Sequence, residues 1–400
     1  MINASVFRIT LLVVFLLLAI VAPLSRAQST QPLATADTLL LREVRFEGNT
    51  VFTSKRLEAE LKNYLGQRIS VDQLEEARLT LTRLYVQSGY ITSGVVLPDQ
   101  DIDPENGVVL FKVVEGKLDR QNANLRGVDG ADNPKTLWFR PSFILDRIMA
   151  GAGKVLNINA LKDRLELLRQ NPNIKRINAE LEPGAAPGES RLDVKVEEEH
   201  PIHFGIEFSN RRPPSVGANR FELFAYDTNL TGNGDALNLR YTLNKGQLDD
   251  WEWAGLDEYS VAYAVPLNPS DTTFEVNYQR DDSPVIEAPF NELNITSQTD
   301  SVYAGLRQPV WRTTTAQGDY REFVLTGGFS FKQNTSKLLG EPFSFSPGAE
   351  NGRTRVSVVR LGQELNFRNQ DRAMSLRSIF SIGIDAMGMT EGDAGVDGQF

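Results

Sequence analysis

Residues 237–244 read Leu-Asn-Leu-Arg-Tyr-Thr-Leu-Asn, an alternation of apolar and polar side chains that decides the fold of the second half of the chain. Successive side chains of a β-strand point to opposite faces, so this pattern predicts a strand with one apolar and one polar face. The alternation returns at 259–265, 274–278, 323–331 and 376–384. We expect about nine such strands, most of them about 10–15 residues long, against about 5–6 residues for a usual soluble strand. Tilted strands of this length are typical of a transmembrane β-barrel.

The loops between these strands differ in length. Residues 232–235 (Gly-Asn-Gly-Asp) make a tight turn, whereas 282–294 and 337–352 are long. This asymmetry is typical of a barrel with short periplasmic turns and long extracellular loops. Because bacterial barrels have an even strand number, we expect the barrel to be incomplete at Phe400. A soluble β-sandwich, which also alternates, is the alternative.

Composition excludes several classes of function. The 42 basic and 52 acidic residues leave a net charge of −10, which argues against a nucleic-acid-binding protein. The chain has no cysteine, so neither disulfides nor thiolate metal sites are possible. Its two histidines, His200 and His203, lack further ligands nearby, and we expect neither a metal nor a cofactor.

The N-terminus predicts export. Arg8 precedes an apolar run from Ile9 to Val21, and small residues flank Arg26 at positions 25 and 27. The run is shorter than the roughly 20 residues of a spanning helix, so a signal peptide over 1–27 is favoured over a membrane anchor. A short linker over 28–40 then leads to the folded part.

Between these two regions one strand–helix–helix–strand–strand pattern occurs twice. The first copy covers 41–116 and contains a capping box formed by Ser70 and Gln73, and the second copy covers 117–200. Two tandem units of this size indicate a modular array rather than one large domain. The strands expected in the first copy are Leu41–Phe46, Tyr90–Leu97 and Gly107–Glu115, and those in the second are 117–127, Ile174–Leu181 and Arg191–Glu197.

Several stretches carry a family resemblance. Residues 171–174 (Asn-Pro-Asn-Ile) with 179–184 (Ala-Glu-Leu-Glu-Pro-Gly) are similar to the second POTRA domain of two-partner-secretion transporters, the haemolysin-activator and filamentous-haemagglutinin transporter family. Residues 229–235 resemble the first hairpin turn of the family's barrel, and 353–364 and 375–385 resemble later strands. The family's inward-folded loop, with its Val-Arg-Gly-Tyr/Phe-type motif, is not found in this sequence, and we do not expect the N-terminal plug helix seen in some members.

The resemblance implies an α+β fold of POTRA domains (βααββ) followed by an antiparallel transmembrane β-barrel. POTRA 1 would cover 41–116, POTRA 2 would cover 117–200, and the incomplete barrel would cover 201–400. It also implies a protein of the bacterial outer membrane that binds an unfolded exoprotein in the periplasm and secretes it through the pore. The implied partners are a large secreted β-helical exoprotein and outer-membrane lipid, without nucleic acid or a small-molecule substrate.

In POTRA domains the strand after the helices lies at the sheet edge, where an extended substrate can pair with it. The candidate binding residues are Tyr90, Thr92, Gly94 and Val96 in the first domain and Ile174, Arg176, Asn178, Glu180 and Glu182 in the second. Inward polar side chains would line the pore, with Arg240, Glu275 and Arg377 as candidates.

Enzymatic interpretations are weaker. Residues 151–154 (Gly-Ala-Gly-Lys) resemble a phosphate-binding loop but lack the earlier glycine and the following hydroxyl residue. Residues 197–199 (Glu-Glu-Glu) are more typical of a solvated strand end than of an acid catalyst or calcium site. Two other functions remain open. One is an insertase that assembles outer-membrane proteins, and the other is a passive porin, for which paired substrate-handling domains would be unnecessary.

Overall fold

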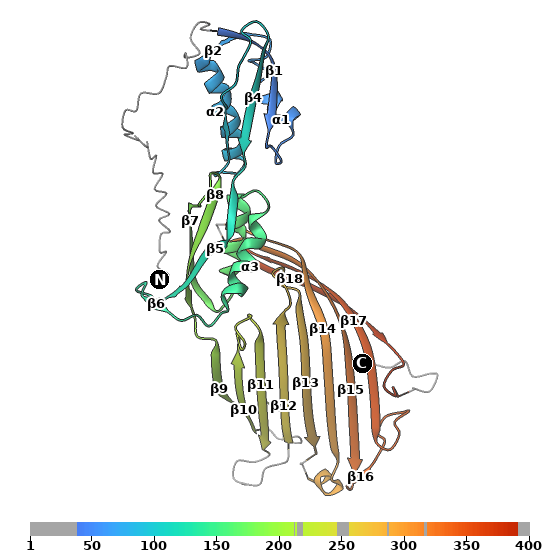
Figure 1. Cartoon of the computed structure of the whole chain (residues 1–400). Coiled ribbons are helices and arrows are strands. Elements are labelled where there is room, and N and C mark those ends of the chain that lie inside the picture. The colour runs from blue at the N-terminus through green and yellow to red at the C-terminus, as the bar shows by residue number, and fades with distance from the viewer. Residues whose placement is uncertain are drawn as a thin grey trace.

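The computed structural model describes residues 38–211, 213, 219–245, 256–285, 288–315 and 318–390, so the expected signal peptide lies outside it. Two small α+β domains follow one another and lead into one large curved sheet (Figure 1). No helix in these described ranges is long and apolar enough to cross a membrane.

The first small domain builds a four-stranded sheet of order β2-β1-β4-β3, in which β1 and β4 are parallel. The helices cover one face of it, and the core between them contains Leu57, Leu81, Tyr85 and Phe111, all fully buried. Its elements in chain order are β1 (Thr38–Glu47), α1 (Ser54–Glu60), β2 (Arg68–Ser70), α2 (Val71–Gln87), β3 (Gly94–Val96) and β4 (Gly107–Val114).

Side-chain caps fix where these helices begin. Thr53 accepts a hydrogen bond from the Arg56 amide at the start of α1. The predicted capping box of α2 is present, because Ser70 Oγ accepts from the Gln73 amide and the Gln73 side chain accepts from the Ser70 amide. Each cap satisfies amides that have no partner inside the helix.

The strand expected over Tyr90–Leu97 is wrong at its N-terminal end, because β3 begins only at Gly94. The Tyr90 ring packs against Phe52 and Tyr85, with centroid distances of 6.2 Å to each. The Tyr90 carbonyl then accepts from the Ser93 amide at 3.0 Å, which closes a turn. Aromatic packing and this turn therefore remove Tyr90 and Thr92 from the strand.

The second small domain repeats the topology, with sheet order β6-β5-β8-β7 and β5 parallel to β8. Phe139, Ile144 and Val194 contribute to its separate core. Its elements are β5 (Lys117–Val128), β6 (Pro134–Lys135), α3 (Pro141–Ala152), α4 (Ile158–Leu168), β7 (Ile174–Pro183) and β8 (Glu189–Glu198). The repeat that the sequence pattern predicts is thus present as two domains of the same strand order, each with one more short strand than expected.

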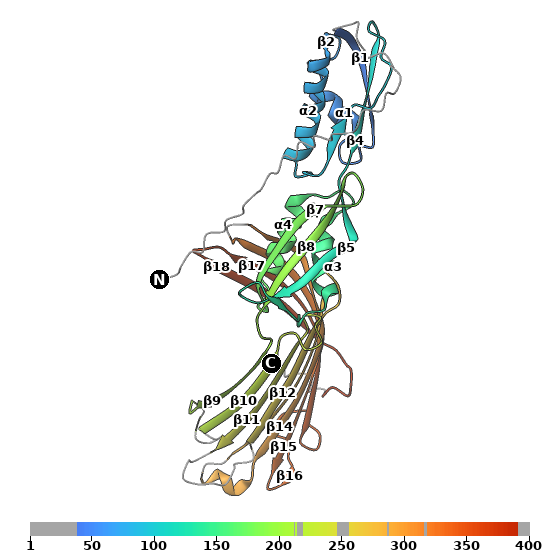
Figure 2. The same cartoon turned by 60° about the vertical axis from the view of Figure 1, so that its left-hand side comes forward.

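The large sheet is antiparallel throughout, and successive strands pair in chain order. Figures 1 and 2 show the long strands side by side and bent into one curved wall. The strands are β9 (Ile202–Ser209), β10 (Asn219–Asp227), β11 (Ala236–Lys245), β12 (Leu256–Pro266), β13 (Thr273–Pro284), β14 (Thr296–Thr314), β15 (Tyr320–Leu338), β17 (Arg353–Arg368) and β18 (Ala373–Gly383), with the short β16 (Glu341–Pro342) paired to β15. A single curved wall agrees with the predicted barrel rather than with two stacked sheets.

The two faces of this sheet differ as the alternation predicts. Phe204 and Phe380 lie on the apolar face and are 86% and 64% exposed. On the polar face Arg220 reaches Glu258 at 3.3 Å, although β11 lies between their strands. Side chains that meet across an intervening strand converge, so the polar face is the concave one. The convex face is apolar and open, as it must be to face lipid.

The strands are staggered, as tilted barrel strands must be. Residues that pair directly across successive strands form a row over the sheet. The row that begins at Ile202, the first residue of β9, reaches β18 at Ile382, close to the C-terminal end of that strand. Short turns join strands at the end of the sheet near the second small domain (Figure 1). The long connections lie at the opposite end and include the 3-10 helix η2 (Phe290–Leu293) and β16.

Candidate functional site

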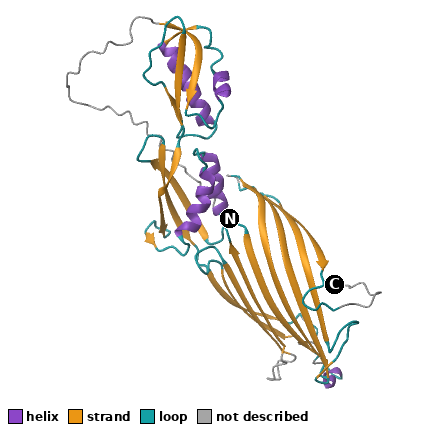
Figure 3. Ribbon diagram, turned by 45° about the vertical axis from the view of Figure 1, so that its right-hand side comes forward, coloured by secondary structure: helices purple, strands orange, loops and turns teal. Residues whose placement is uncertain are grey.

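The outer strand β7 is the most extended sheet edge in either small domain and is labelled in Figures 1 and 2. Figure 3 shows the strands of both small domains in orange beside their purple helices. It pairs with β8 on one side only, and its predicted residues Arg176, Asn178, Glu180 and Glu182 alternate on the solvent face. Ile174 begins the strand and is buried. The structure therefore brings all five predicted residues of this domain onto one edge strand. In the first domain only Gly94 and Val96 of the four lie in β3.

Ion pairs order the solvent face of β7. The Arg176 side chain reaches Glu197 at 3.1 Å and Asp132 at 2.7 Å, and Arg191 pairs with Glu182. Glu180 lies directly opposite Asp193 in the register. Burial raises the pKa of Asp193, but hydrogen bonds from Arg126 and Asn124 outweigh it and hold the pKa below its ordinary value. Asp193 is thus a charged neighbour of Glu180.

Asn157 links the two small domains, because its side chain bonds both to the start of α4 and to the end of α2. Its Oδ1 accepts from the Asn159 amide at 2.9 Å and thereby caps α4. Its Nδ2 donates to the carbonyl of Ser88, the C-terminal cap of α2, at 3.0 Å. The Ile158 amide adds a bond to the Gly89 carbonyl at 2.9 Å. Gly89 has φ +93°, and a Cβ there would lie 2.7 Å from Asn157 Oδ1, so this contact requires glycine.

The second small domain contacts the short turns of the large sheet. The Arg140 amide donates to the Gly232 carbonyl at 2.8 Å, and the Asn173 Nδ2 donates to the Thr228 carbonyl at 2.9 Å. A Cβ on Gly234 would lie 2.5 Å from the Phe143 ring, so helix α3 approaches this turn closely. The predicted tight turn at 232–235 therefore serves as a docking surface for α3.

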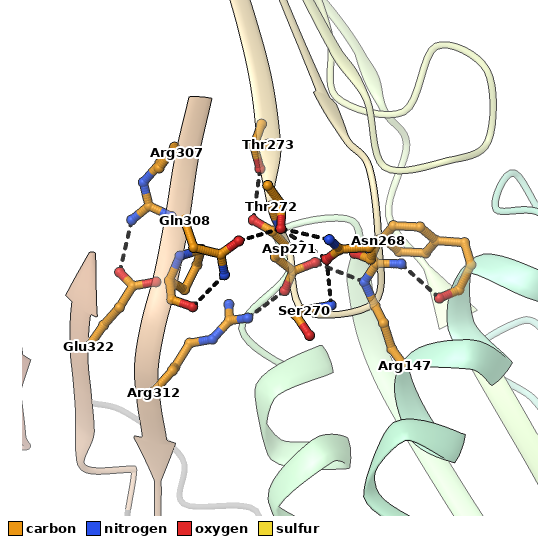
Figure 4. A network of polar contacts seen from close by, with 12 residues as sticks. Arg147, Asn268, Ser270, Asp271, Thr272, Thr273, Arg307, Gln308, Arg312 and Glu322 are labelled. Carbon is orange, nitrogen blue, oxygen red and sulfur yellow. Dashed lines mark hydrogen bonds and ion pairs between the residues drawn. The ribbon is translucent and has the colours of Figure 1, made fainter. Parts of the chain in front are cut away.

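A largely buried ionic cluster, which we term the clamp, completes this contact (Figure 4). It comprises Arg147 of α3, Asp271 of the turn between β12 and β13, and Arg312 of β14. Asp271 Oδ1 accepts from Arg147 Nη2 at 2.7 Å and Nε at 3.0 Å, while its Oδ2 accepts from Arg312 Nη2 at 2.5 Å. The Arg147 guanidinium also stacks 3.6 Å from the centroid of the Phe143 ring. One carboxylate thus binds the small domain and the sheet wall together.

The predicted pore-lining residues share the concave face, and two of them form ion pairs there. Arg240 lies 2.9 Å from Glu222, and Arg377 lies 3.2 Å from Glu364. Glu275 alternates with outward-facing Phe274 and pairs in register with Gly305. Both arginine side chains remain more than half exposed to the hollow, so the concave wall presents paired but accessible charge.

The other polar motifs have structural partners instead of ligands. Glu197 pairs with Lys175 at 2.9 Å, and Glu198 accepts from the amides of Trp138 and Phe139 at 2.6 and 2.9 Å. The ring of His203 stacks on Tyr226. No group of three or more histidine, cysteine, aspartate or glutamate side chains suited to a metal occurs in the described ranges.

Sequence reasoning missed the clamp and the Asn157 junction. Arg147 and Asp271 are 124 residues apart, and neither lies in a distinctive motif. A helix N-cap at Asn157 is readable from the sequence, but its second bond to the preceding domain is not.

Comparison with known proteins now identifies the family. A ShlB-type POTRA domain model matches residues 39–116, and the model of the haemolysin secretion/activation protein ShlB/FhaC/HecB matches residues 188–385. The chain belongs to the ShlB/FhaC/HecB family of two-partner-secretion transporters. Its fold is that of POTRA domains followed by the wall of a β-barrel, as predicted.

Individual relatives agree with this assignment. The outer membrane transporter CdiB of Dickeya dadantii is 27% identical over 195 residues, which are 49% of this chain and 32% of the relative. The heme/hemopexin transporter protein HuxB of Haemophilus influenzae is 23% identical over 282 residues, 62% of this chain and 47% of the relative. The structure of CdiB from Escherichia coli superposes with a TM-score of 0.60 at 20% identity, covering 94% of this chain and 64% of CdiB. The chain therefore spans a third to a half of the curated relatives that it matches.

Proposed function

We propose that this ShlB/FhaC/HecB-family chain accepts an unfolded exoprotein in the periplasm and passes it outward through its barrel. The barrel lies in the bacterial outer membrane, and the POTRA domains lie in the periplasm. The observation that carries the proposal is that the candidate binding edge and the barrel wall are physically connected. A long sheet edge, β7, belongs to the same domain that the clamp ties to the mouth of a polar-lined wall.

The proposed first step is strand addition at the POTRA edge. An extended substrate segment pairs with the free backbone groups of β7, beside Ile174, Arg176, Asn178, Glu180 and Glu182. Each added hydrogen bond contributes only about 0.5–1.5 kcal/mol net, so four or five bonds give a weak grip. Weak binding suits a transporter, because the segment must be released into the pore.

The proposed second step is passage along the concave wall. Arg240, Glu275 and Arg377 project from three different strands into the polar hollow. A wet and charged wall exchanges hydrogen bonds with a passing backbone and offers no apolar surface on which an unfolded segment would stick.

The proposed partner is a large secreted exoprotein of β-helical shape, and lipid surrounds the apolar convex face. The ShlB/FhaC/HecB match favours secretion over the assembly-insertase alternative. A substrate-handling domain fixed to the mouth of the wall, with a second domain joined to it, argues against a passive porin.

The direct test is secretion of the partner exoprotein, whose gene is first sought among the neighbours of the transporter gene. Deletion of the transporter gene should leave that exoprotein inside the cell, and expression of the intact transporter should restore its release. An Ala179→Pro variant should lower capture of the exoprotein in a pull-down, because proline removes an amide donor that points away from β8. Ala179→Ser, which keeps the amide donor at the same position, is the matched control. Unchanged secretion without the gene would contradict the proposal.

A further inference from the structure

The backbone of β3 has one residue whose polar groups point outward. In an antiparallel pair, hydrogen-bonded and non-hydrogen-bonded residues alternate along the strand. Gly94 and Val96 lie opposite Val114 and Lys112 of β4, and Val95 lies between them. Both the amide and the carbonyl of Val95 bond to side chains of α2 rather than to β4. The Val95 groups are therefore those that an added strand would use.

Helix α2 already occupies these groups. Thr82 Oγ1 accepts from the Val95 amide at 3.1 Å, and Arg78 Nη1 donates to the Val95 carbonyl at 2.8 Å. The two side chains lie one helical turn apart, so together they match the donor and acceptor of one residue. Glu75 holds the guanidinium from the other side through Arg78 Nε at 2.9 Å.

A third side chain covers the next outward residue of the same edge. Beyond the end of β3, the Leu110 amide of β4 donates to Gln100 Oε1 at 2.7 Å, and Gln100 Nε2 donates to the Leu110 carbonyl at 2.9 Å. The Gln100 amide thus makes the two bonds that a neighbouring strand would make. We term Arg78, Thr82 and Gln100 the edge seal.

The corresponding edge of POTRA 2 has no such seal among the described residues. The Gly184 amide bonds to the Glu189 carbonyl, and alternation from this pair leaves the polar groups of Ile177, Ala179 and Leu181 pointing away from β8. No side-chain hydrogen bond to these three backbones occurs within the described ranges. The exposed carboxylate of Glu180 lies beside them and faces Asp193 in the register.

We propose that the edge seal closes POTRA 1 to strand addition and directs the substrate segment to β7 of POTRA 2. The inference rests on the proposed function and deepens it by choosing between the two edges. The segment that fits is an extended one that alternates apolar with polar residues. Its apolar side chains lie over partly buried Ala179, Leu181 and Leu165, and its polar side chains are cationic or neutral beside Glu180.

The test uses the full chain in detergent and a synthetic ten-residue peptide of alternating valine and lysine as the probe. Amide hydrogen exchange should show the Val95 amide protected before any peptide is added. The peptide should slow exchange at Ile177, Ala179 and Leu181 and leave Val95 unchanged. A peptide alternating valine and glutamate should bind more weakly, because it places carboxylates beside Glu180 and Asp193.

A variant that gains peptide binding provides the more decisive test. The double variant Arg78→Ala, Thr82→Val should expose Val95 to exchange and create a second peptide site in POTRA 1, with affinity at that site rising by about threefold to tenfold over the sealed edge. If Arg78 and Thr82 were ordinary contact residues, their loss would lower affinity instead. Retained protection of the β4 amides shows that the variant is folded. Glu105→Ala, which removes an exposed ion pair with Arg68 in the same domain, should change nothing.

The outcomes separate the two proposals. Peptide protection at Val95 in the unaltered chain, or a double variant that binds no better, overturns the edge seal while leaving export in place. Peptide protection at neither edge, together with exoprotein release after gene deletion, overturns the proposed function itself.

Discussion

Replacing Asp271 by alanine should loosen POTRA 2 from the barrel wall, because this one carboxylate neutralises two guanidinium groups. Arg147 and Arg312 are only 10% and 18% exposed at their side chains, and Asp271 is 29% exposed. In the alanine variant two cations face one another without their shared anion. Breaking a buried ion pair by removing one partner costs about 3–5 kcal/mol.

The partial exposure of Asp271 places the expected loss at the lower end, about 3 kcal/mol. A loss of that size raises the population of the opened junction by about two orders of magnitude. Arg147→Met should destabilise the junction less, because Asp271 and Arg312 still pair with each other in that variant. A double-mutant cycle of Arg147→Met with Asp271→Asn should give a coupling energy of about 0.5–3 kcal/mol.

Native-state hydrogen exchange of the Arg140 amide, which donates to the Gly232 carbonyl across the junction, measures this opening directly in the full chain. The matched control is Glu105→Ala, whose pair with Arg68 is exposed at both side chains and should contribute less than about 1 kcal/mol. If Asp271→Ala and Glu105→Ala accelerate exchange of the Arg140 amide equally, the clamp does not hold the junction and the reasoning from burial is wrong.

Two further predictions concern the ends of POTRA 2. Asn157→Ala should destabilise the junction between the POTRA domains by about 0.5–2 kcal/mol, because it removes the cap of α4 and the bond to Ser88 together. A broader distribution of spin-label distances between the two domains would show this, and Asn159→Ala is the control. Burial raises the pKa of Glu198 above 4.5 despite the amide bonds from Trp138 and Phe139, so the folded state disfavours its ionisation. The stability that protonated Glu198 contributes is therefore fully present below pH 4.5 and is lost as pH rises through the raised pKa. In Glu198→Gln the thermal midpoint should fall less between about pH 4 and 7 than in the unaltered protein. An unaltered pH profile would contradict the raised pKa of Glu198.

Much of this architecture could be predicted because its causes are local. Alternation over 237–244 fixed both the strand and its two faces, since a polar side chain such as Arg240 cannot face lipid without a large cost. The cap of α2 was equally readable, because Ser70 and Gln73 satisfy each other's amides over three residues.

The remaining features depend on contacts between distant segments. Nothing near Tyr90 in the sequence indicates that its ring joins Phe52 and Tyr85, yet that packing ends the expected strand. The clamp unites residues from a helix, a turn and a strand of two domains, and each of the three is an ordinary surface charge in its own local context. The edge seal is similar, because Arg78 and Thr82 read as polar positions of an amphipathic helix.

The two POTRA domains differ at their edges although their topology is the same, and the difference follows from what their second helices contact. Helix α2 has 17 residues and lies beside β3, so its side chains reach the outward backbone of that strand. Helix α4 has 11 residues and packs towards the barrel, where it contacts β14 and where Gln170 just beyond its end accepts from Arg368. Helix α4 also packs against β7, but none of its side chains bonds to the outward backbone of that strand among the described residues. The shorter helix that contacts the barrel therefore leaves the edge of its own domain open, whereas the longer helix of POTRA 1 covers the outward groups of β3.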